Sequence, residues 1–502
     1  MERYILAHDL GTSGNKATVY DSQGQLAAFQ LSAYPTFYPF ANAVEQDPNA
    51  WWAAVCQSTR QLLAESGIPP EAIAGVTFSG QMMGCVLADR QGASLRNAII
   101  WADSRAGEEE AFLRDCMPPE RFYRITGHRP AAFYSLAKLL WVKKHEPNIF
   151  ARAHKMLNAK DFIIHRLTGR FVTDYSDASS TNLLDIEKKD WSAEILEKAG
   201  ISRDLLPELH SSLDTVGRVT EEAARLTGLR PGTPVIAGGG DGSCAAVGAG
   251  VADEGSAYIV IGSSSWISSA SRRPVYNDDM LTFNWVALDP AYYTPCGTMQ
   301  AAGYSVQWLK DTLCAIDGVE AEARGADVYA VINEKIAASP PGAGGVLYLP
   351  YLLGERSPRW NAQAKGCFLN LTISATRNDL LRAVLEGVAY NLRVILDLIS
   401  AQHPVEKITA IGGGAKNELW LQIMADIWQK PVEALAHVEE ATSLGAAVCA
   451  GTALGIFPGM DAARRFNPVA KIFTPNPDNR QVYEGLYREF NEAYDRLYGG
   501  KT

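Results

Sequence analysis

The sequence predicts an α/β protein built from two large domains. Apolar, β-branched segments alternate with helical segments along the chain, and most glycine-rich turns follow a strand. A strand, a turn of glycines and hydroxyl residues, and a further strand occur twice, about 250 residues apart, near the length of a whole domain. The 502 residues, 47 % of them hydrophobic, suffice for two sizeable cores. Because α/β sheets bind ligands at the carboxyl ends of strands, these turns are the first candidate sites.

The first strand–turn unit is Tyr4–Gly14, which reads YILAHDLGTSG. Its apolar half suits a buried strand, and Gly11 and Gly14 end that strand. The turn offers backbone N–H groups and hydroxyls without bulky side chains, as the approach of a phosphate chain requires. Asp9 is a candidate Mg²⁺ ligand, because Mg²⁺ binds oxygen and keeps several of its waters. An ordinary Asp/Gly turn at a strand end is the alternative.

The second unit lies in the other half of the chain. The apolar segment 257–261 (AYIVI) meets Gly262 and three serines, and a strand resumes at Trp266. Two such turns facing each other would grip one polyphosphate from both sides. The functional hypothesis is built on the presence of these two similar turns.

The remaining segments continue the alternation of strands and helices. The segment 47–66 is expected to be a helix, with Asp47 as its N-cap and Pro48 at its first position. Further expected strands are 16–20, 25–31, 73–78, 99–103, 234–237, 266–269, 346–352 and 408–411, and further expected helices are 135–144, 159–168, 243–251, 301–312, 327–339, 378–400, 420–428, 443–454 and 481–498.

The domain boundary is expected near the middle of the chain. The strand 234–237 ends in Gly238–Gly242, and a helix of small residues follows it. We place the boundary after this turn, which gives domains 1–245 and 246–502.

Charge and cysteine usage exclude several classes of protein. Lys and Arg number 46 against 56 Asp and Glu, a net charge of −10 with no basic cluster, so neither nucleic acid nor an anionic membrane is an expected partner. The eight cysteines are scattered without metal-ligand spacing, which favours reduced thiols in the cytoplasm. No export signal and no unbroken apolar stretch of about eighteen residues is evident. Neither the Walker motif nor GxGxxG before a helix occurs, which argues against a P-loop NTPase and a Rossmann dehydrogenase.

A series of motifs occurs in a characteristic order. They are DLGTSG, EQDP–WW (45–52), SGQM, a segment with Trp101 and Asp103, FYSLAKLLWVKKHEP (133–147), AKDFIIHRLTG, GGGDG, GSSS, LPYLLGERSP (349–358), RAVLEG (382–387) and IGGGAKNELW. With these motifs the chain resembles the FGGY family of carbohydrate kinases over nearly its whole length, and it is closest to the xylulokinase branch. Asn370 departs from one family signature, where a glycine is usual.

The resemblance implies two ribonuclease-H-like domains of the actin-like ATPase type, with a cleft between them. It implies ATP-dependent phosphorylation of a hydroxyl of a small sugar, with Mg²⁺, by a sugar-binding N-terminal and a nucleotide-binding C-terminal domain. An alcohol that attacks phosphorus must lose a proton, and the resemblance makes Asp241 that general base. The alternative role of Asp241, the N-cap of the helix that follows, is compatible with catalysis.

The resemblance also assigns residues to ATP and to the metal. Asp9 and Asp241 would hold the metal, and the two turns would hold the phosphates. Lys16 either adds positive charge there or is a solvated strand residue, and the sequence leaves both readings open. The expected nucleotide-binding residues are Gly11, Thr12, Ser13, Gly14, Lys16, Gly262, Ser263, Ser264, Gly303, Gln307, Gly413, Gly414 and Asn417.

The sugar is expected to lie among polar side chains on apolar walls. By the resemblance, the expected substrate-binding residues are Gln81, Met82, Met83, Trp101, Asp103, Phe133 and Asp241. Lys138 and Trp141 are interpreted as helix scaffold, and Glu355 and Arg356 as a loop that orders the cleft. His8 is interpreted as a satisfied core residue.

Three positions in this pocket depart from the usual xylulokinase pattern. Met83 stands where a histidine is usual, and Ala102 and Gly242 stand where asparagines are usual. A site that loses a partner for a hydroxyl discriminates against the ligand that offered it. We therefore expect a ketopentose such as xylulose, or a related ketose or polyol, without committing to D-xylulose.

Two other functions remain as alternatives. One is an actin- or chaperone-like nucleotide switch, against which the sugar-pocket motifs argue. The other is a catalytically inactive sugar sensor, which the presence of Asp9 and Asp241 disfavours. Dimers are common in the family, so a homodimer is an expectation from the resemblance alone.

Overall fold

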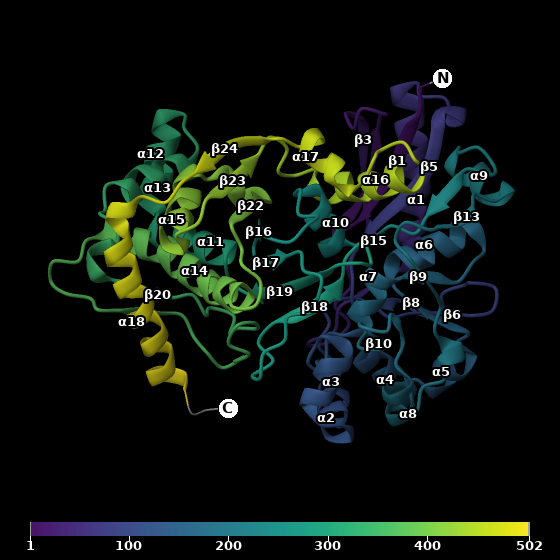
Figure 1. Cartoon of the computed structure of the whole chain (residues 1–502), viewed down its shortest axis with the longest axis horizontal. Helices are drawn as coiled ribbons and strands as arrows, with labels where there is room; N and C mark the ends of the chain where they lie inside the picture. Colours follow the sequence, from purple (N-terminus) through teal and green to yellow (C-terminus); the bar gives the residue numbers. More distant parts are fainter. Residues whose placement is uncertain (1, 500–502) are drawn as a thin grey trace. The chain divides into compact units, whose positions relative to one another are not determined.

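The computed structural model describes residues 2–499 and divides into two compact units (Figure 1). The first unit comprises residues 1–253, 270–294 and 440–467, and the second comprises 254–269, 295–439 and 468–502. The chain therefore leaves the first unit after residue 253 and returns to it twice. Each unit is organised around one mixed sheet.

The first unit's sheet has the strand order β13-β14-β5-β1-β2-β3, with β15 also paired to β5. Strands β1, β2 and β3 form an antiparallel meander, whereas β1, β5 and β14 run parallel. The bounds of its strands are β1 Tyr4–Leu10, β2 Gly14–Tyr20, β3 Leu26–Ala33, β5 Ile73–Gly80, β13 Thr215–Arg218, β14 Pro234–Ile236 and β15 Gly239–Gly240.

Helices cover both faces of this sheet, as the nearly continuous apolar sequence of β1 requires. Leu6 and Leu10 of β1 pack into the core beneath helix α1, and Ile5 and Ala7 pack into the core beneath α10 and α16. Alternate residues of one strand thus serve two cores, because successive side chains point to opposite faces. The helices of this unit are α1 Pro48–Ser66, α2 Gly107–Cys116, α3 Pro119–Thr126, α4 Ser135–His145, α5 Pro147–Arg152, α6 Ala159–Thr168, α7 Tyr175–Ala178, α8 Ala193–Ala199, α9 Glu221–Thr227, α10 Asp241–Gly248, α16 Ala441–Ala453 and α17 Ala463–Phe466.

A third core of the first unit lies among α2, α3, α4 and α8. Short strand pairs connect this helical region to the sheet-bearing part of the unit. They are β4 Glu45–Gln46 with β7 Ala98–Ile99, β6 Val86–Ala88 with β8 Lys155–Leu157, β9 Val172–Asp174 with β12 Glu208–His210, and β10 Leu184–Asp185 with β11 Asp190–Trp191. Strand β18 (Phe283–Val286) belongs to the segment 270–294 of the same unit.

The second unit repeats the topology of the first. Its sheet order is β24-β23-β22-β16-β17-β19, with β16, β17 and β19 antiparallel and β16, β22 and β23 parallel. The bounds are β16 Ser256–Ile261, β17 Ser265–Ser269, β19 Tyr293–Met299, β22 Lys407–Ile411, β23 Val432–Leu435 and β24 Val469–Phe473, with a separate pair of β20 Leu347–Leu349 and β21 Cys367–Leu369. The internal repeat expected from the sequence is therefore a repeat of the whole sheet.

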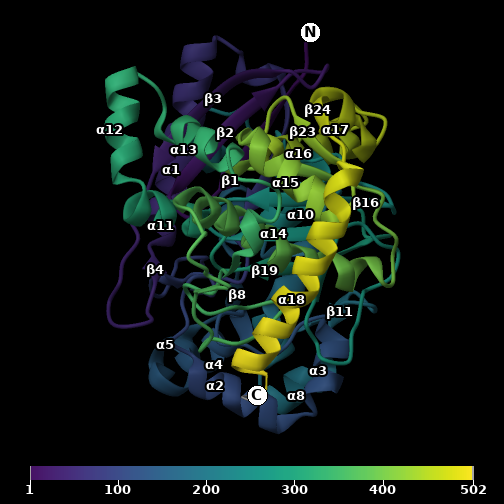
Figure 2. The same cartoon turned by 90° about the vertical axis from the view of Figure 1, so that its left-hand side faces the viewer.

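The long helix α14 (Arg377–Ser400) is buried on all sides over residues 381–392 and shares the main core of the second unit with β16, β17 and β22. The terminal helix α18 (Arg480–Tyr498) packs against α14, α15 and β20, and Figure 2 shows it running across the front of this unit. The remaining helices are α11 Gly303–Leu313, α12 Ala315–Arg324, α13 Val328–Ala337 and α15 Glu418–Trp428.

Most sequence-based elements are confirmed to within two or three residues, including the helix at 47–66 with its Asp47 cap. The expected strand 99–103 is wrong, because only Ala98–Ile99 is extended and residues 101–102 form a turn. The helix expected at 243–251 begins at Asp241, and Gly240 takes the N-cap position. No helix within residues 2–499 has the length and apolar character needed to cross a membrane.

Candidate active site

Two carboxylates of the first unit lie at the carboxyl ends of β1 and β15, which pair with β5 on either side. Asp9 on β1 is in register with Ser79 on β5, and Ser79 is in register with Gly239 on β15. Ser79 Oγ donates a hydrogen bond of 2.9 Å to Asp9 Oδ1. Asp241 follows β15 directly as the first residue of α10. The parallel pairing of three strands therefore brings together two residues that are 232 positions apart in the sequence, counting from 9 to 241.

The environment of these carboxylates favours their protonated forms. Burial raises the pKa of Asp241 to about 7, and the negative charge of Asp9 contributes to that shift. Burial also raises the pKa of Asp9, against the opposing effects of the Ser79 hydrogen bond and the Lys16 charge. Both side chains keep some solvent exposure. A carboxylate with a pKa near neutrality is suited to accept a proton at physiological pH.

The turn after β1 presents the groups expected from the sequence. Gly11 N–H donates to Gly14 O at 3.1 Å, which closes the turn. The Thr12 hydroxyl accepts a hydrogen bond of 2.8 Å from the Trp101 indole. Lys16 is in register with Asp9 across β1 and β2, and its ammonium lies 3.7 Å from Glu440. Lys16 therefore lies beside the carboxylates and is part of their charge environment.

The expected sugar-binding residues Gln81, Met82 and Met83 follow β5 on the same edge of the sheet. Gln81 Nε2 donates to Gln46 Oε1 at 2.9 Å. Met82 packs directly against the Asp241 loop, since a Cβ at Gly240 would lie 2.6 Å from its sulfur. Met83 has a positive φ of 60°, and its N–H donates to Ser180 Oγ at 3.1 Å.

Trp101, Asp103 and Phe133 differ in their exposure. The side chains of Trp101 and Phe133 are accessible, whereas Asp103 is fully buried. Asp103 Oδ2 accepts from Val44 N–H at 2.6 Å and from Arg105 Nε at 2.8 Å. In this structure Asp103 therefore holds the loop before β4 rather than facing solvent.

Lys138 has a larger role in the site than the sequence indicated. Its fully buried ammonium donates to three backbone carbonyls: Met83 O at 2.8 Å, Ile100 O at 2.8 Å and Phe133 O at 2.6 Å. These carbonyls belong to the three separate segments that carry the expected sugar-binding residues. One side chain on α4 thus ties the sugar-binding segments together.

Gly242, which stands where an asparagine is usual, packs beside the side chain of Trp285 on β18. A Cβ at Gly242 would lie 3.1 Å from Trp285 Cζ3, so the indole occupies the space beside the residue that follows Asp241. The indole also contacts the rings of His128 and Phe283, at centroid distances of 5.9 and 5.1 Å. Trp285 comes from a segment far from the other motifs, and no pattern in the sequence signalled its place here.

The second unit holds a cavity of about 650 Å³ at the corresponding edge of its own sheet. Gly414 is needed for packing, since a Cβ there would lie 2.2 Å from Ile261 Cγ2, whereas the same atom at Gly413 would meet open space. Asn417 caps α15 by accepting from Trp420 N–H at 3.2 Å. Ser264 lies in the turn beside the cavity, and the expected residues that line it are Gly262, Ser263, Gly303, Gln307, Gly413, Gly414 and Asn417.

Several residues that line this cavity were not predicted from the sequence. Asn333 exchanges hydrogen bonds of 3.2 Å with Asn417, and Tyr329 lies one helical turn before it on α13. The spacing of four between these residues is too common in helices to have signalled a site. Lys416 and Trp420 also line the cavity, and their place within the IGGGAKNELW motif was the available signal.

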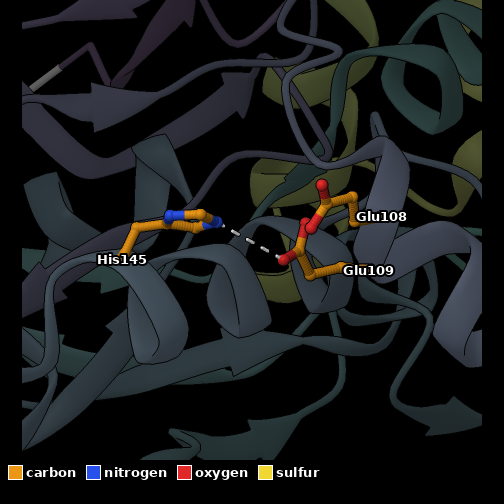
Figure 3. Close-up of side chains that lie close together, drawn as sticks. All are labelled: Glu108, Glu109 and His145. Carbon is orange, nitrogen blue, oxygen red and sulfur yellow. Dashed lines mark ion pairs between the residues drawn. The ribbon is translucent and has the colours of Figure 1, made fainter.

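A separate cluster of two carboxylates and an imidazole lies on the first unit (Figure 3). Among the described residues, Glu108, Glu109 and His145 form the one group of three that brings potential ligand atoms within 4.8 Å of one another. The ammonium of Lys144 lies 2.6 Å from Glu108 Oε2 and 3.9 Å from Glu109 Oε1. An ammonium thus already lies within ion-pair distance of both carboxylates, so we interpret the cluster as a charged network rather than a metal centre.

His8 is confirmed as a core residue. It is buried, its ring stacks on Phe78, and its Nδ1 lies 3.1 Å from Asn15 Nδ2. Burial lowers its pKa to about 4, so the ring is neutral at physiological pH.

Comparisons with known proteins agree with this architecture. Residues 4–248 match the N-terminal domain of the FGGY family of carbohydrate kinases, and residues 257–454 match its C-terminal domain. The chain is 35 % identical to a xylulose kinase of Bacillus subtilis over 98 % of this chain and 97 % of that protein. Among solved structures, a xylulose kinase from Rhodospirillum rubrum has 31 % identity and a TM-score of 0.92, with 99 % of both chains covered. A gluconate kinase from Lactobacillus acidophilus has 26 % identity and a TM-score of 0.93, with 100 % of this chain and 99 % of that chain covered.

Proposed function

Because the chain belongs to the FGGY family of carbohydrate kinases, we propose that it transfers the γ-phosphoryl group of ATP to a hydroxyl of a small sugar with Asp241 as the general base. The observation that carries this proposal is the carboxylate pair of Asp9 and Asp241 at one sheet edge. The pKa of Asp241, raised to about 7 by burial and by the charge of Asp9, supports it. The expected acceptor is a ketopentose such as xylulose, or a related ketose or polyol.

In this mechanism the sugar hydroxyl donates its proton to Asp241 as the oxygen attacks the terminal phosphorus. The hydroxyls and N–H groups of the turn after β1 stabilise the negative charge that develops on the transferred group. Lys16 lies beside Asp9 and reduces the repulsion between the carboxylates and that group. In this mechanism Asp9 would support a cation, whereas Asp241 would take the proton.

The residues present fit a hard divalent cation such as Mg²⁺. Asp9 and Asp241 supply carboxylate oxygens, which hard cations prefer, and both keep some exposure through which water ligands can enter. A cation bound here would neutralise charge on the phosphate oxygens. Because a cation favours the ionised carboxylate, its binding and the protonation of Asp241 compete.

ATP is expected to bind through the cavity of the second unit. Its volume of about 650 Å³ lies within the usual range for small-molecule sites. The base and ribose would lie against the walls formed by Gly413, Asn417 and Gln307, and the turn at 262–264 would hold phosphates. The sugar-binding candidates lie in the first unit, whereas the nucleotide-binding candidates lie in both units: the turn after β1 in the first and this cavity in the second.

The acceptor pocket would be formed by Gln81, Met82, Met83, Trp101 and Phe133. Asp103 would act by holding the neighbouring loop, as its hydrogen bonds to Val44 and Arg105 indicate. Relatives named xylulose kinase and gluconate kinase make D-xylulose and D-gluconate the first acceptors to test. The methionine, alanine and glycine at positions 83, 102 and 242 argue against an unchanged preference for D-xylulose. Cytoplasmic location and a homodimer are further parts of the proposal, and the eight free thiols support the former.

The decisive experiment measures sugar-dependent ADP formation with a panel of ketoses, polyols and sugar acids, for the wild-type protein and Asp241→Ala. We expect turnover with at least one acceptor, and its loss in Asp241→Ala while ATP binding measured by calorimetry survives. Sugar-independent ATP hydrolysis that persists in Asp241→Ala would instead indicate a nucleotide switch. D-xylulose exceeding every other acceptor by orders of magnitude in kcat/KM would refute the altered specificity.

A further inference from the structure

The loop that carries Asp241 has little means of fixing its own conformation. The three residues before it are Gly238, Gly239 and Gly240, and Gly238 adopts a left-handed φ of 63°. Glycine provides no side chain to pack or to form hydrogen bonds, and it has the greatest backbone freedom. Beyond the pairing of Gly239 and Gly240 with β5 and the start of α10, any precise placement of Asp241 must therefore come from side chains outside this segment.

The hydroxyl of Ser176 provides such a contact. Gly240 N–H, one residue before Asp241, donates to Ser176 Oγ at 3.0 Å, and Ser176 is fully buried. The same hydroxyl lies so close to the loop that a Cβ at Gly239 would be 2.6 Å from it. Ser176 is thus in direct contact with both residues that precede the carboxylate.

The orientation of the Ser176 hydroxyl in this contact is determined by Asp174. Ser176 Oγ donates to Asp174 Oδ2, and that oxygen also accepts from Ser176 N–H at 2.8 Å and from Ser212 Oγ at 2.7 Å. An ionised carboxylate can only accept hydrogen bonds, so the Ser176 hydroxyl donates to Asp174. A lone pair of the same hydroxyl oxygen is then left to accept from Gly240 N–H. Hydrogen bonds to a charged group are also the stronger ones.

A buried ammonium holds Asp174 in turn. Lys160 Nζ lies 2.8 Å from Asp174 Oδ1, 2.7 Å from Asp161 Oδ1 and 3.5 Å from Asp177 Oδ2, and all four side chains are buried. Burial alone would lower the pKa of Lys160, but these carboxylates raise it well above its ordinary value, so the ammonium is charged. Below the loop, a Cβ at Gly80, the strand partner of Gly240, would lie 3.0 Å from Lys160 Cβ.

We propose that Ser176, oriented by Asp174 and Lys160, is a positioning residue that holds the Gly240 peptide and so aims the Asp241 carboxylate at the acceptor hydroxyl. The inference rests on the proposed role of Asp241 as general base. Lys160, Asp174, Ser176 and Gly240 would then act as one chain of hydrogen bonds and ion pairs from a rigid core to a glycine loop. A displacement of about 1 Å at a catalytic group costs up to about a hundredfold in rate, which sets the scale of the expected effect.

The test compares Ser176→Ala with Ser212→Ala. Both substitutions remove a buried hydroxyl that donates to Asp174 Oδ2, but only Ser176 contacts the Gly240 N–H. The two variants should therefore lose similar stability, measured by thermal unfolding. We expect Ser176→Ala to lower kcat between about tenfold and a hundredfold with an unchanged KM for ATP, and Ser212→Ala to stay within about twofold of the wild type.

The pH profile of kcat/KM for the sugar supplies a readout that loss of stability would not move. The charged groups around Asp241 are Asp9 on β1, with Lys16 opposite it on β2, and the cluster of Lys160 on α6, Asp174 on β9 and Asp177 on α7. A loosened loop lets the carboxylate reach better-solvated positions, which lowers its pKa. We expect the acidic limb of the profile to move to lower pH in Ser176→Ala and to stay in place in Ser212→Ala.

Ser176→Cys guards against a failure of the alanine variant to fold, because the thiol fills the same space while accepting hydrogen bonds only weakly. Its kcat should also fall below that of Ser212→Ala. Equal kcat in the Ser176 variants and Ser212→Ala, or an acidic limb that stays in place, overturns the positioning role. Asp241→Ala is assayed in parallel: if it retains sugar-dependent turnover, the proposed base itself is wrong, whereas an inactive Asp241→Ala with a fully active Ser176→Ala refutes only the positioning role.

Discussion

At the scale of single residues, the site contains carboxyl groups whose pKa values are raised by burial. Asp241 is a carboxylate that burial and a like charge drive toward its protonated form. Keeping such a group in the fold costs stability when it is ionised, and this cost is typical of functional positions. Replacing Asp241 with a neutral residue should therefore abolish turnover and raise the free energy of unfolding.

Asp241→Asn tests both effects. The pKa of Asp241 in the folded protein is about 7, above its ordinary value of 3.8, so the folded state holds the proton more tightly than the unfolded state. The free energy of unfolding therefore falls as the pH rises between these two values. The asparagine variant should therefore be more stable than the wild type at pH 8 by about 1 to 3 kcal/mol, and no more stable near pH 4. Urea unfolding at both pH values measures this, and turnover should be lost. An equal change in stability at the two pH values would contradict the raised pKa.

Gly242→Asn tests the packing between Gly242 and Trp285. The added Cβ would lie 3.1 Å from the indole, so either Trp285 or the start of α10 must move. We expect the single variant to lose kcat/KM with the best acceptor, and Trp285→Ala to recover part of that loss in the double variant, with a coupling of about 0.5 to 3 kcal/mol. Kinetics of the four proteins give the coupling. Effects that simply add would show that the two positions act independently.

At the scale of elements, each strand end in the first unit presents one functional segment. The turns after β1, β5 and β15 carry the phosphate-binding, sugar-binding and catalytic candidates in that order. Helix α4 contributes from outside the sheet through Lys138, whose ammonium fixes three backbone carbonyls. The shape of the sugar pocket thus depends on a helix that supplies none of its expected contacts.

Lys138→Met should disorder the sugar pocket while leaving the nucleotide cavity unchanged. The substitution keeps a long apolar side chain but leaves three buried carbonyls without their donor, each at a cost of about 1–3 kcal/mol unless water enters. We expect a higher KM for the sugar and a much smaller change in the KM for ATP, since the cavity expected to hold the base and ribose lies in the second unit. Lys144→Met, on the same helix but exposed, is the matched control and should behave like the wild type. Equal rises in both KM values would point to general unfolding.

At the scale of the whole molecule, the chain contains one sheet topology twice and uses it for two purposes. In each unit the first two strands enclose a glycine-hydroxyl turn: β1 and β2 in the first, β16 and β17 in the second. The strand that lies parallel to the first one ends in SGQMMG in the first unit and in IGGG in the second. The same edge of the repeated sheet therefore carries sugar-pocket candidates in one copy and the cavity proposed for the nucleotide in the other.

The first unit should not fold from residues 1–253 alone. Helix α16 comes from residues 441–453, yet it packs on β1, β5 and α10. The fit is close, since a Cβ at Gly445 would lie 1.9 Å from Cys244 O and one at Gly248 would lie 1.7 Å from Ala441 O. We expect the fragment 1–253 to bind a hydrophobic dye and to lack a cooperative thermal transition, because one face of β1 loses its cover. Appending residues 270–294 and 440–467 through flexible linkers should restore the transition, and a cooperative fragment 1–253 would contradict this account.

The sequence was sufficient wherever the physical signal is local. Apolar alternation located the strands, Asp47 with Pro48 located the start of α1, and the glycine-hydroxyl turns located both phosphate-binding candidates, because these patterns arise from backbone geometry within a few residues. The order of motifs placed Asp9 and Asp241 in one family site. Short-range patterns, however, carry no information about which distant segments meet.

Tertiary packing alone decided the rest. Four features join residues at least 38 positions apart: the membership of residues 440–467 in the first unit, the contact of Trp285 with Gly242, two of the three carbonyls bound by Lys138, and the support of Gly240 by Ser176. Lys138 and Ser176 lie in helices whose sequence predicts only burial, and their partners are backbone groups, which every residue possesses. A side chain that acts on the backbone of a distant segment leaves no signature in the sequence of that segment, so only the folded chain identifies it.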